Sequence, residues 1–236
     1  MCTDSNSKDS TEKLSLKADN LFQQGNYFKA EKLFRKLLDI KRRTLGDCDP
    51  DTLLTLCMLG AVLCNHGRYR EAAVYFKQCL DKQNLVLGEN HPETLMTLLN
   101  LGNAYARQGQ YSEAAKLHKK CFERRKSILG ESDRSTIYAL AALASSISGL
   151  ERHSEAEVLY KQCLNKQKEV LGENHPDTIE TMGSLALTYD YQRQYSEAEV
   201  LYKQCLDKMK EVLGESHRST LHTLSNLAAN LSNLGQ

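Results

Sequence analysis

The sequence predicts an all-α protein built from repeated helix pairs, on the basis of a fixed repeat length, helical spacing of apolar residues and regularly placed glycines. A Leu-Gly dipeptide recurs every 42 residues, with its glycine at Gly46, Gly88, Gly130, Gly172 and Gly214. No insertion interrupts this register, which indicates that each 42-residue unit is one structural repeat. With 236 residues, of which 41% are hydrophobic, the chain can bury a core.

Apolar spacing divides each repeat into two helices. Between Pro92 and Gly109 apolar side chains recur every three or four residues, which is the helical period, and we name this segment helix A. A second segment with the same spacing, helix B, lies between Ser112 and Leu129. Extending this pair by the repeat length predicts a flexible tail over residues 1–11. Residues 12–236 are then expected to form five helix pairs and a final, unpaired helix A.

The stretch LGENHPETL separates helix B of one repeat from helix A of the next. Gly88 is suited to end a helix because glycine adopts a left-handed backbone at little cost. Pro92 is suited to the first helical turn, where its missing N–H is not needed. His91 is replaced at the same repeat position by Asp49 and Asp133. A polar residue flanking a helix explains these exchanges better than a metal ligand or an acid–base catalyst.

Composition argues against several classes of partner. Lys plus Arg number 31 and Asp plus Glu 30, so no net field draws the chain to nucleic acid or to an anionic membrane. The first residues lack the apolar core of a signal peptide, and no later stretch approaches the roughly 18 apolar residues of a membrane-spanning helix. A soluble, cytoplasmic protein is therefore expected.

The eight cysteines are expected to be reduced, because the chain has no secretion signal. Four of them share one repeat position of helix B: Cys79, Cys121, Cys163 and Cys205. We predict that they are core residues, since stacked repeats lie about 10 Å apart, whereas a disulfide needs Cα atoms within about 7 Å. No Cys-x-x-Cys spacing provides a zinc site.

Catalytic motifs are missing from the sequence. It contains no phosphate-binding loop, nucleophile elbow or His-Glu-x-x-His, and its carboxylates fall mostly at periodic surface positions. We therefore predict no enzyme activity, no cofactor and no metal. A metal- or thiol-dependent enzyme is the contrasting hypothesis, which stoichiometric zinc or native disulfides in the purified protein would support.

The segment NLGNAYARQGQYSEAAKLHKKCFERRKSILGES, together with the HPETL before it, resembles the 42-residue tetratricopeptide repeats of kinesin light chains and nephrocystin-like proteins. The resemblance covers the chain from about Ser10 to its end. It implies a right-handed superhelical solenoid of antiparallel helix pairs. It also implies that the concave face of this solenoid, built mainly by the A helices, holds a peptide or partner protein. Glu151 and Arg193 depart from the pattern, since they occupy a turn position that is glycine at Gly25 and Gly67.

Helix geometry predicts which side chains of helix A face away from the core. At about 100° per residue, positions 56, 59, 60, 63 and 66 cluster as the packed face, and 54, 58, 61 and 65 lie opposite. Carrying the second set through the repeats predicts a peptide-binding groove. Its candidate residues are Met96, Asn100, Asn103, Arg107, Tyr138, Ser145, Leu187, Tyr191 and Asn226.

The candidate groove residues vary between repeats, whereas the packed residues recur. Variation is expected of a binding surface, although drift on an unused solvated face produces the same pattern. The Asn100 and Asn103 amides can bond a peptide backbone, Met96 and Tyr138 offer apolar contact, and Arg107 can hold a carboxylate.

We therefore predict a non-catalytic scaffold that binds a protein or peptide, in the specific form of a kinesin-light-chain-like cargo adaptor. The alternative is a regulatory repeat segment of a larger protein whose catalytic or motor-linked part lies outside this chain. The chain stops where a further helix B is expected, which indicates a fragment or truncated product. Leu224, Leu227 and Leu231 would then form an exposed apolar stripe that favours self-association through the open C-terminal end.

Overall fold

A computed structural model describes residues 3–235 of the chain, and side chains from residue 11 onward. The described part consists of eleven α-helices and contains no strand. The helices are α1 Thr3–Gln23, α2 Tyr27–Thr44, α3 Pro50–Asn65, α4 Tyr69–Val86, α5 Pro92–Arg107, α6 Tyr111–Leu129, α7 Arg134–Gly149, α8 His153–Val170, α9 Pro176–Tyr191, α10 Tyr195–Leu213 and α11 Arg218–Asn233. The all-α repeat fold expected from the sequence is confirmed.

Helices α5 and α6 coincide with the helix A and helix B that apolar spacing predicts. Odd-numbered helices are therefore A helices and even-numbered ones B helices. Helix α1 begins at Thr3 and so covers most of residues 1–11, where the sequence analysis places a tail. The flexibility of that segment stays a prediction.

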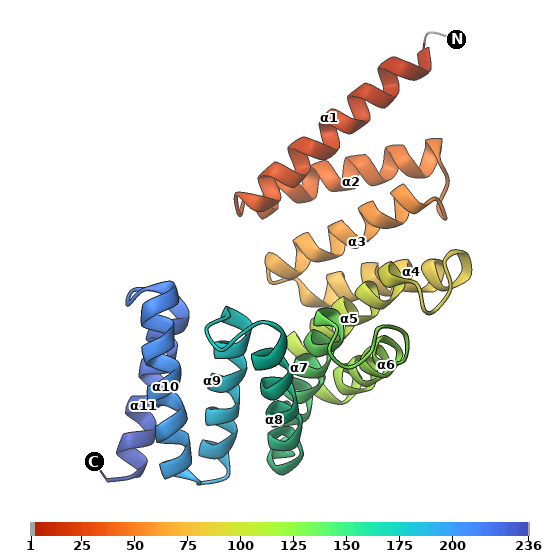
Figure 1. The fold of residues 1–236 in the computed structure, drawn as a ribbon. Helices are drawn as coiled ribbons and strands as arrows, with labels where there is room; N and C mark the ends of the chain where they lie inside the picture. Colours follow the sequence, from red (N-terminus) through yellow and green to blue (C-terminus); the bar gives the residue numbers. More distant parts are fainter. Residues whose placement is uncertain (1–2, 236) are drawn as a thin grey trace. The chain divides into compact units, whose positions relative to one another are not determined.

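The chain divides into two compact units, residues 1–117 and 118–236, with the boundary inside α6. In the first unit, α1 to α4 follow one another as antiparallel neighbours, each packed on the next (Figure 1). Their shared core includes Phe34 of α2, Leu59 of α3 and Phe76 of α4, each at most 1% exposed. This packing holds the exposed faces of α2, α3 and α5 on one compact body.

The second unit is built in the same way, with α7 packed on α8, α8 on α9, α9 on α10 and α10 on α11. Tyr202 of α10 is fully buried between Ala186 of α9 and Leu227 of α11. A second cluster of buried residues includes Ile137 and Leu140 of α7. The small alanine leaves room for the large ring opposite it, which is how alternating volumes fill a core.

The connection between repeats is a helix stop followed by a helix start, as predicted. Gly88 has a φ of 87°, in the left-handed region that favours glycine. His91 is the N-cap of α5, with its Nδ1 accepting a hydrogen bond from the backbone N–H of Glu93 at 3.3 Å, and Pro92 follows in the first turn. Asp49 caps α3 through the equivalent bond. A His and an Asp are exchangeable here because each offers an acceptor to an unpaired helix N–H.

The four cysteines that share a position of helix B are fully buried free thiols, which confirms their predicted core location. Cys79, Cys163 and Cys205 each donate S–H to a backbone carbonyl 26 residues earlier, on the preceding A helix. This bond satisfies the one polar group of a side chain that otherwise behaves as a small hydrophobe.

Candidate functional site

In the first unit, the predicted groove residues lie along one face of α5 that points away from the core. Met96 is 49% exposed, Arg107 is exposed, and Asn100 and Asn103 are half-buried. Leu101, on the predicted packed face, is 4% exposed. The helical phase derived from the sequence therefore separates core from surface on α5.

Helix α3 follows the predicted phase with one exception. Leu54 is 51% exposed on the predicted groove side, whereas Leu56, Leu59 and Leu63 are each at most 1% exposed. His66 was predicted on the packed face, but its side chain is 38% exposed. It lies just beyond the last turn of α3 and caps the helix, so the angular rule for a continuing helix no longer applies.

Two cysteines of α3, which the sequence analysis did not select, border the same face. The Thr97 hydroxyl donates to the Cys57 sulfur at 3.7 Å. Hydrogen bonding with the neighbouring Cys79, Thr97 and Asn100 side chains outweighs burial and lowers the pKa of Cys57 from its ordinary value. Burial raises the pKa of Cys64 to about 11. The Asn100 side chain therefore has a partner inside the unit and can offer a ligand only part of its hydrogen-bonding capacity.

The five groove candidates of the second unit lie on α7, α9 and α11. Tyr138 is 53% exposed and Ser145 is exposed, whereas Leu187 and Asn226 are half-buried. Leu187 packs against the core cluster around Tyr202, so only part of it is free to contact a ligand.

Tyr191 is the most exposed of these aromatic side chains, at 58%. Its ring stacks on His153, with centroids 4.8 Å apart and planes 18° apart. Nearby, burial raises the pKa of Tyr160 to about 12, while hydrogen bonding with Ser145 and Ser184 opposes that rise. The Tyr191 ring is thus held against the His153 ring, whereas Tyr160 is buried and is not part of the exposed surface.

Helix α11 corrects one prediction. The expected exposed stripe of Leu224, Leu227 and Leu231 is wrong for two of its members, because Leu227 is 7% exposed and Leu231 packs against the same core cluster. Leu224 is 47% exposed, and Leu221 is 53% exposed. The apolar spacing selected the wrong residues because α11 packs its apolar side chains onto α9 and α10.

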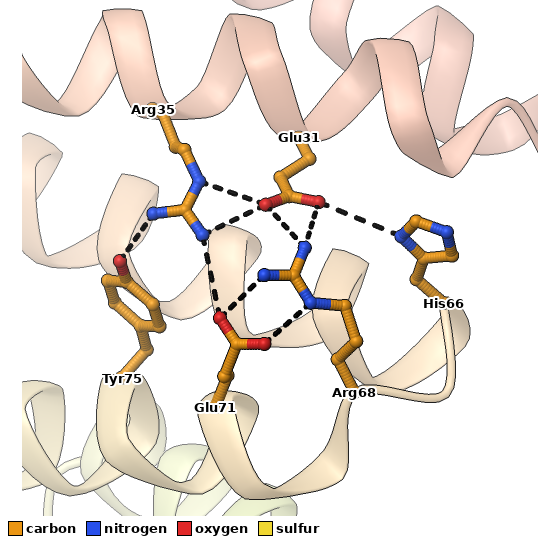
Figure 2. A network of polar contacts seen from close by, with 6 residues as sticks. All are labelled: Glu31, Arg35, His66, Arg68, Glu71 and Tyr75. Carbon is orange, nitrogen blue, oxygen red and sulfur yellow. Dashed lines mark hydrogen bonds and ion pairs between the residues drawn. The ribbon is translucent and has the colours of Figure 1, made fainter.

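A charged cluster of the first unit was also missed by the sequence analysis. It consists of Glu31, Arg35, His66, Arg68, Glu71 and Tyr75, and Figure 2 shows these side chains converging from α2, α4 and the turn between α3 and α4. Arg68 donates to both carboxylate oxygens of Glu31 at 2.7 Å and to both oxygens of Glu71 at 2.6 Å. Arg35 donates to Glu31 at 2.9 Å and to the Tyr75 hydroxyl at 2.7 Å.

Glu31 is the buried centre of this cluster, with its side chain 9% exposed. Burial by itself raises its pKa, but hydrogen bonds from Arg35 and Arg68 together outweigh burial and hold the pKa below its ordinary value of 4.5. The carboxylate is therefore charged and fully used by two guanidinium groups, which makes it a cross-helix link and a poor general base.

Among the residues the structure describes, no group of three or more His, Cys, Asp or Glu side chains is placed to hold a metal ion. Within the same part of the chain, no helix is both long and apolar enough to cross a membrane.

Sequence comparison supports this assignment of the repeats. The tetratricopeptide repeat profile matches residues 9–84, 75–127 and 135–211, which together make up most of the chain. The chain belongs to the tetratricopeptide-repeat family. A search of curated protein sequences finds no match.

Solved structures with the same fold share little sequence with this repeat protein. One is a Podosopora anserina protein with nearly identical TPR-like repeats, assigned as a kinesin light chain. It is 24% identical, has a TM-score of 0.73, and the match covers 86% of this chain and 96% of that chain. BtubC (BKLC) from P. vanneervenii has 16% identity and a TM-score of 0.66, covering 95% and 84%. The apo form of RapI has 12% identity and a TM-score of 0.75, covering 94% and 83%. At these identities the likeness shows the fold, which is typically that of a non-catalytic protein-interaction scaffold.

Proposed function

We propose that this tetratricopeptide-repeat protein is a non-catalytic scaffold that binds a peptide or partner protein on the outward faces of its A helices. The observation that carries the proposal is a contrast between the two faces of α5. Its buried side chains recur at the equivalent positions of the other A helices, whereas its outward side chains vary. A core needs constant packing, whereas a binding face needs chemistry specific to its ligand.

In the first unit, the α5 face offers three kinds of contact to an extended peptide. Asn100 and Asn103 can pair with backbone amides, Met96 provides an adaptable apolar surface, and the Arg107 guanidinium can hold a carboxylate. In the second unit, the exposed rings of Tyr138 and Tyr191 provide apolar area with a polar tip.

The specific form we propose is a cargo adaptor like a kinesin light chain, acting in the cytoplasm. A solved structure of a protein assigned as a kinesin light chain shares the fold, which supports this choice. The seven cysteines that the structure describes are all free thiols, as is usual in a reducing compartment. Self-association belongs to the same proposal, with the exposed Leu221 and Leu224 of α11 as its contact residues.

The test uses two variants of α5 and a partner identified by pull-down with mass spectrometry. Asn100→Ala combined with Asn103→Ala should leave the protein folded, although the hydrogen bond of Asn100 with Cys57 is lost, because both side chains are only half-buried. Its thermal unfolding midpoint should fall far less than that of Leu101→Ala. Loss of two net hydrogen bonds of about 0.5–1.5 kcal/mol each should weaken partner binding by about 5- to 150-fold.

Leu101→Ala is the matched control, since it removes a buried side chain from the same helix. It should cost about 2–5 kcal/mol of stability through the cavity it leaves. If the asparagine pair unfolds the protein while Leu101→Ala is silent, the assignment of faces is wrong. Unchanged affinity in the asparagine variant would place the partner on another surface.

A further inference from the structure

The outward face of α2 carries a stripe of unpaired basic side chains. This basic stripe consists of Lys29, Lys32, Lys36 and Arg43, all of them exposed. At about 100° per residue, these positions fall within one narrow arc, opposite the buried side chains of α2 that face the core. Asp39 is the one acidic residue within that arc. With Asp39, the arc has five positions, which we call the stripe positions. They carry a charge of +3, from four basic groups and one carboxylate.

The repeat provides an internal control for this charge. The position of Lys29 is glutamate in all four other B helices, at Glu71, Glu113, Glu155 and Glu197. In α10 the five stripe positions are Glu197, Val200, Gln204, Asp207 and Glu211, also all exposed, with a charge of −3. The same positions in α4 and α8 each carry −2, and those in α6 are neutral. The same helix is thus built without net positive charge at these positions in the other four repeats, so the fold does not require the basic stripe.

The basic side chains of the stripe also lack carboxylate partners. Among the side chains that the structure describes, none of the four has an ion-pair partner. Lysines on other B helices do find carboxylates, as Lys161 does with Glu157 at 2.7 Å. Lys32 instead lies 4.2 Å above the ring of Phe28, which is itself 58% exposed. Like charges left close together on one face create a local field that attracts an anionic ligand.

A depression lies at the Phe28 end of the stripe. It is open to solvent, has a volume of about 450 Å³ and is lined by residues 24–28 and His66. An apolar side chain can contact the Phe28 ring there. The stripe itself runs about 21 Å from Lys29 to Arg43 at 1.5 Å per residue, which matches six or seven residues of extended chain.

We propose that the basic stripe of α2 is a docking surface for an acidic segment of a partner protein, with an apolar residue of that segment against Phe28. Asp39 favours a protein over a membrane or a nucleic acid, because a uniformly anionic surface would be repelled at this carboxylate. A peptide can place a neutral or basic residue at that point. The surface is separate from the face of α5 and does not depend on the function proposed there.

The test exchanges the stripe for the residues that α10 carries at the same positions. The stripe variant is Lys29→Glu, Lys32→Val, Lys36→Gln and Arg43→Glu, a change of −6 in charge. Each new residue already occupies this exposed position in the same protein, so the fold should be unaffected. The charge-matched control is Lys77→Glu, Lys119→Glu and Lys210→Glu, also −6, at exposed positions of α4, α6 and α10.

The probe is a fluorescein-labelled peptide of six glutamates and one glutamine followed by one phenylalanine, with the glutamine five residues before the phenylalanine, where an extended chain reaches Asp39. It is titrated by fluorescence anisotropy. The natural protein should bind it with an affinity that falls as salt is added, and the stripe variant should bind about tenfold or more weakly. The charge-matched control and the Asn100→Ala, Asn103→Ala variant should both bind as the natural protein does. Equal losses in the stripe variant and the charge-matched control would overturn the proposal, since net charge would then explain them.

Two further ligands identify the class of partner. Vesicles of phosphatidylcholine and phosphatidylserine in a 4:1 ratio, and a 20-base-pair DNA duplex, are titrated under the same conditions. Both should bind more weakly than the peptide. If either binds more tightly, and loses that binding in the stripe variant, the proposed protein partner is wrong and the stripe is a lipid or nucleic-acid surface.

Discussion

The repeat position of Glu31 in α2 is occupied by Glu157 in α8, three repeats later, and the two carboxylates are held by different partners. Glu31 accepts hydrogen bonds from two guanidinium groups, those of Arg35 and Arg68. Its side chain is 9% exposed, against 19% for that of Glu157. The first unit therefore carries the more buried and more strongly paired carboxylate.

Glu157 uses weaker partners at matching repeat positions. Lys161 donates to it at 2.7 Å from the position of Arg35, and Gln192 donates at 2.9 Å from the position of His66. The position of Arg68 holds Gln194, whose side chain is exposed. One backbone arrangement thus tolerates either a bidentate charge network or an amide and an ammonium. A repeat fold can vary the strength of its cross-helix links without changing its helices.

Removing the central arginine should produce the largest difference between the two units. Arg68→Met leaves Glu31 buried with one guanidinium fewer, and we expect a local loss of about 1–3 kcal/mol, reduced from the fully buried case because the Arg68 side chain is 37% exposed. Amide hydrogen exchange across α2 to α4 measures this loss. Gln194→Met, at the same position of the second unit, should change the free energy of local opening measured by exchange by less than about 0.5 kcal/mol. Similar effects of both variants would show that the charged cluster adds nothing to the local stability of the first unit.

The second largest difference between the two units is expected on acidification, in the stability that Glu31 and Glu157 each contribute. The pKa of Glu31 is below 4.5 in the folded protein, so the folded state binds protons less readily than the unfolded chain. The stability that Glu31 contributes is present above about pH 4.5 and is lost as the pH falls through its folded pKa. The protection of α2 amides, which compares their exchange with the intrinsic rate at the same pH, should therefore fall below pH 4.5.

Glutamine variants isolate this contribution to the pH dependence. Glu31→Gln should flatten the pH dependence of exchange in the first unit more than Glu157→Gln flattens it in the second, because two guanidinium groups act on Glu31 and one ammonium on Glu157. An unchanged profile in Glu31→Gln would assign the acid sensitivity to other carboxylates.

The turns between paired helices should give the smallest effect. Arg193, before α10, has a φ of 61°, in the left-handed region, whereas the equivalent Gly67 of the first unit has a φ of 80°. Arg193→Gly removes steric strain and should stabilise α9 and α10 by about 0.5–1 kcal/mol, partly offset by the freer unfolded chain. Gly67→Ala should destabilise the first unit by a similar amount. Thermal unfolding of both variants tests the pair, and a destabilised Arg193→Gly would contradict the strain argument.

Much of the architecture was predictable because it depends on local chemistry. Helix boundaries follow from residues that cap or stop a helix within a few positions, as His91 and Gly88 do for α5 and α4. The buried positions follow from the 3.6-residue period, which placed Leu101 in the core and Met96 outside it. The basic stripe of α2 was also visible in the sequence, but only when equivalent repeat positions are compared one by one.

The sequence by itself determined the repeat, its helices, their caps and most of the core, since each depends on residues a few positions apart. Only the tertiary structure decided which polar groups meet. Arg68 reaches Glu31 across 37 residues and Arg35 reaches Tyr75 across 40, so these bonds depend on how two helices pack and which rotamers fit between them. The proximity of Cys57 to Thr97, also 40 residues apart, arose in the same way. Long side chains leave many such pairings open, and packing selects among them by burying one carboxylate and leaving others in solvent.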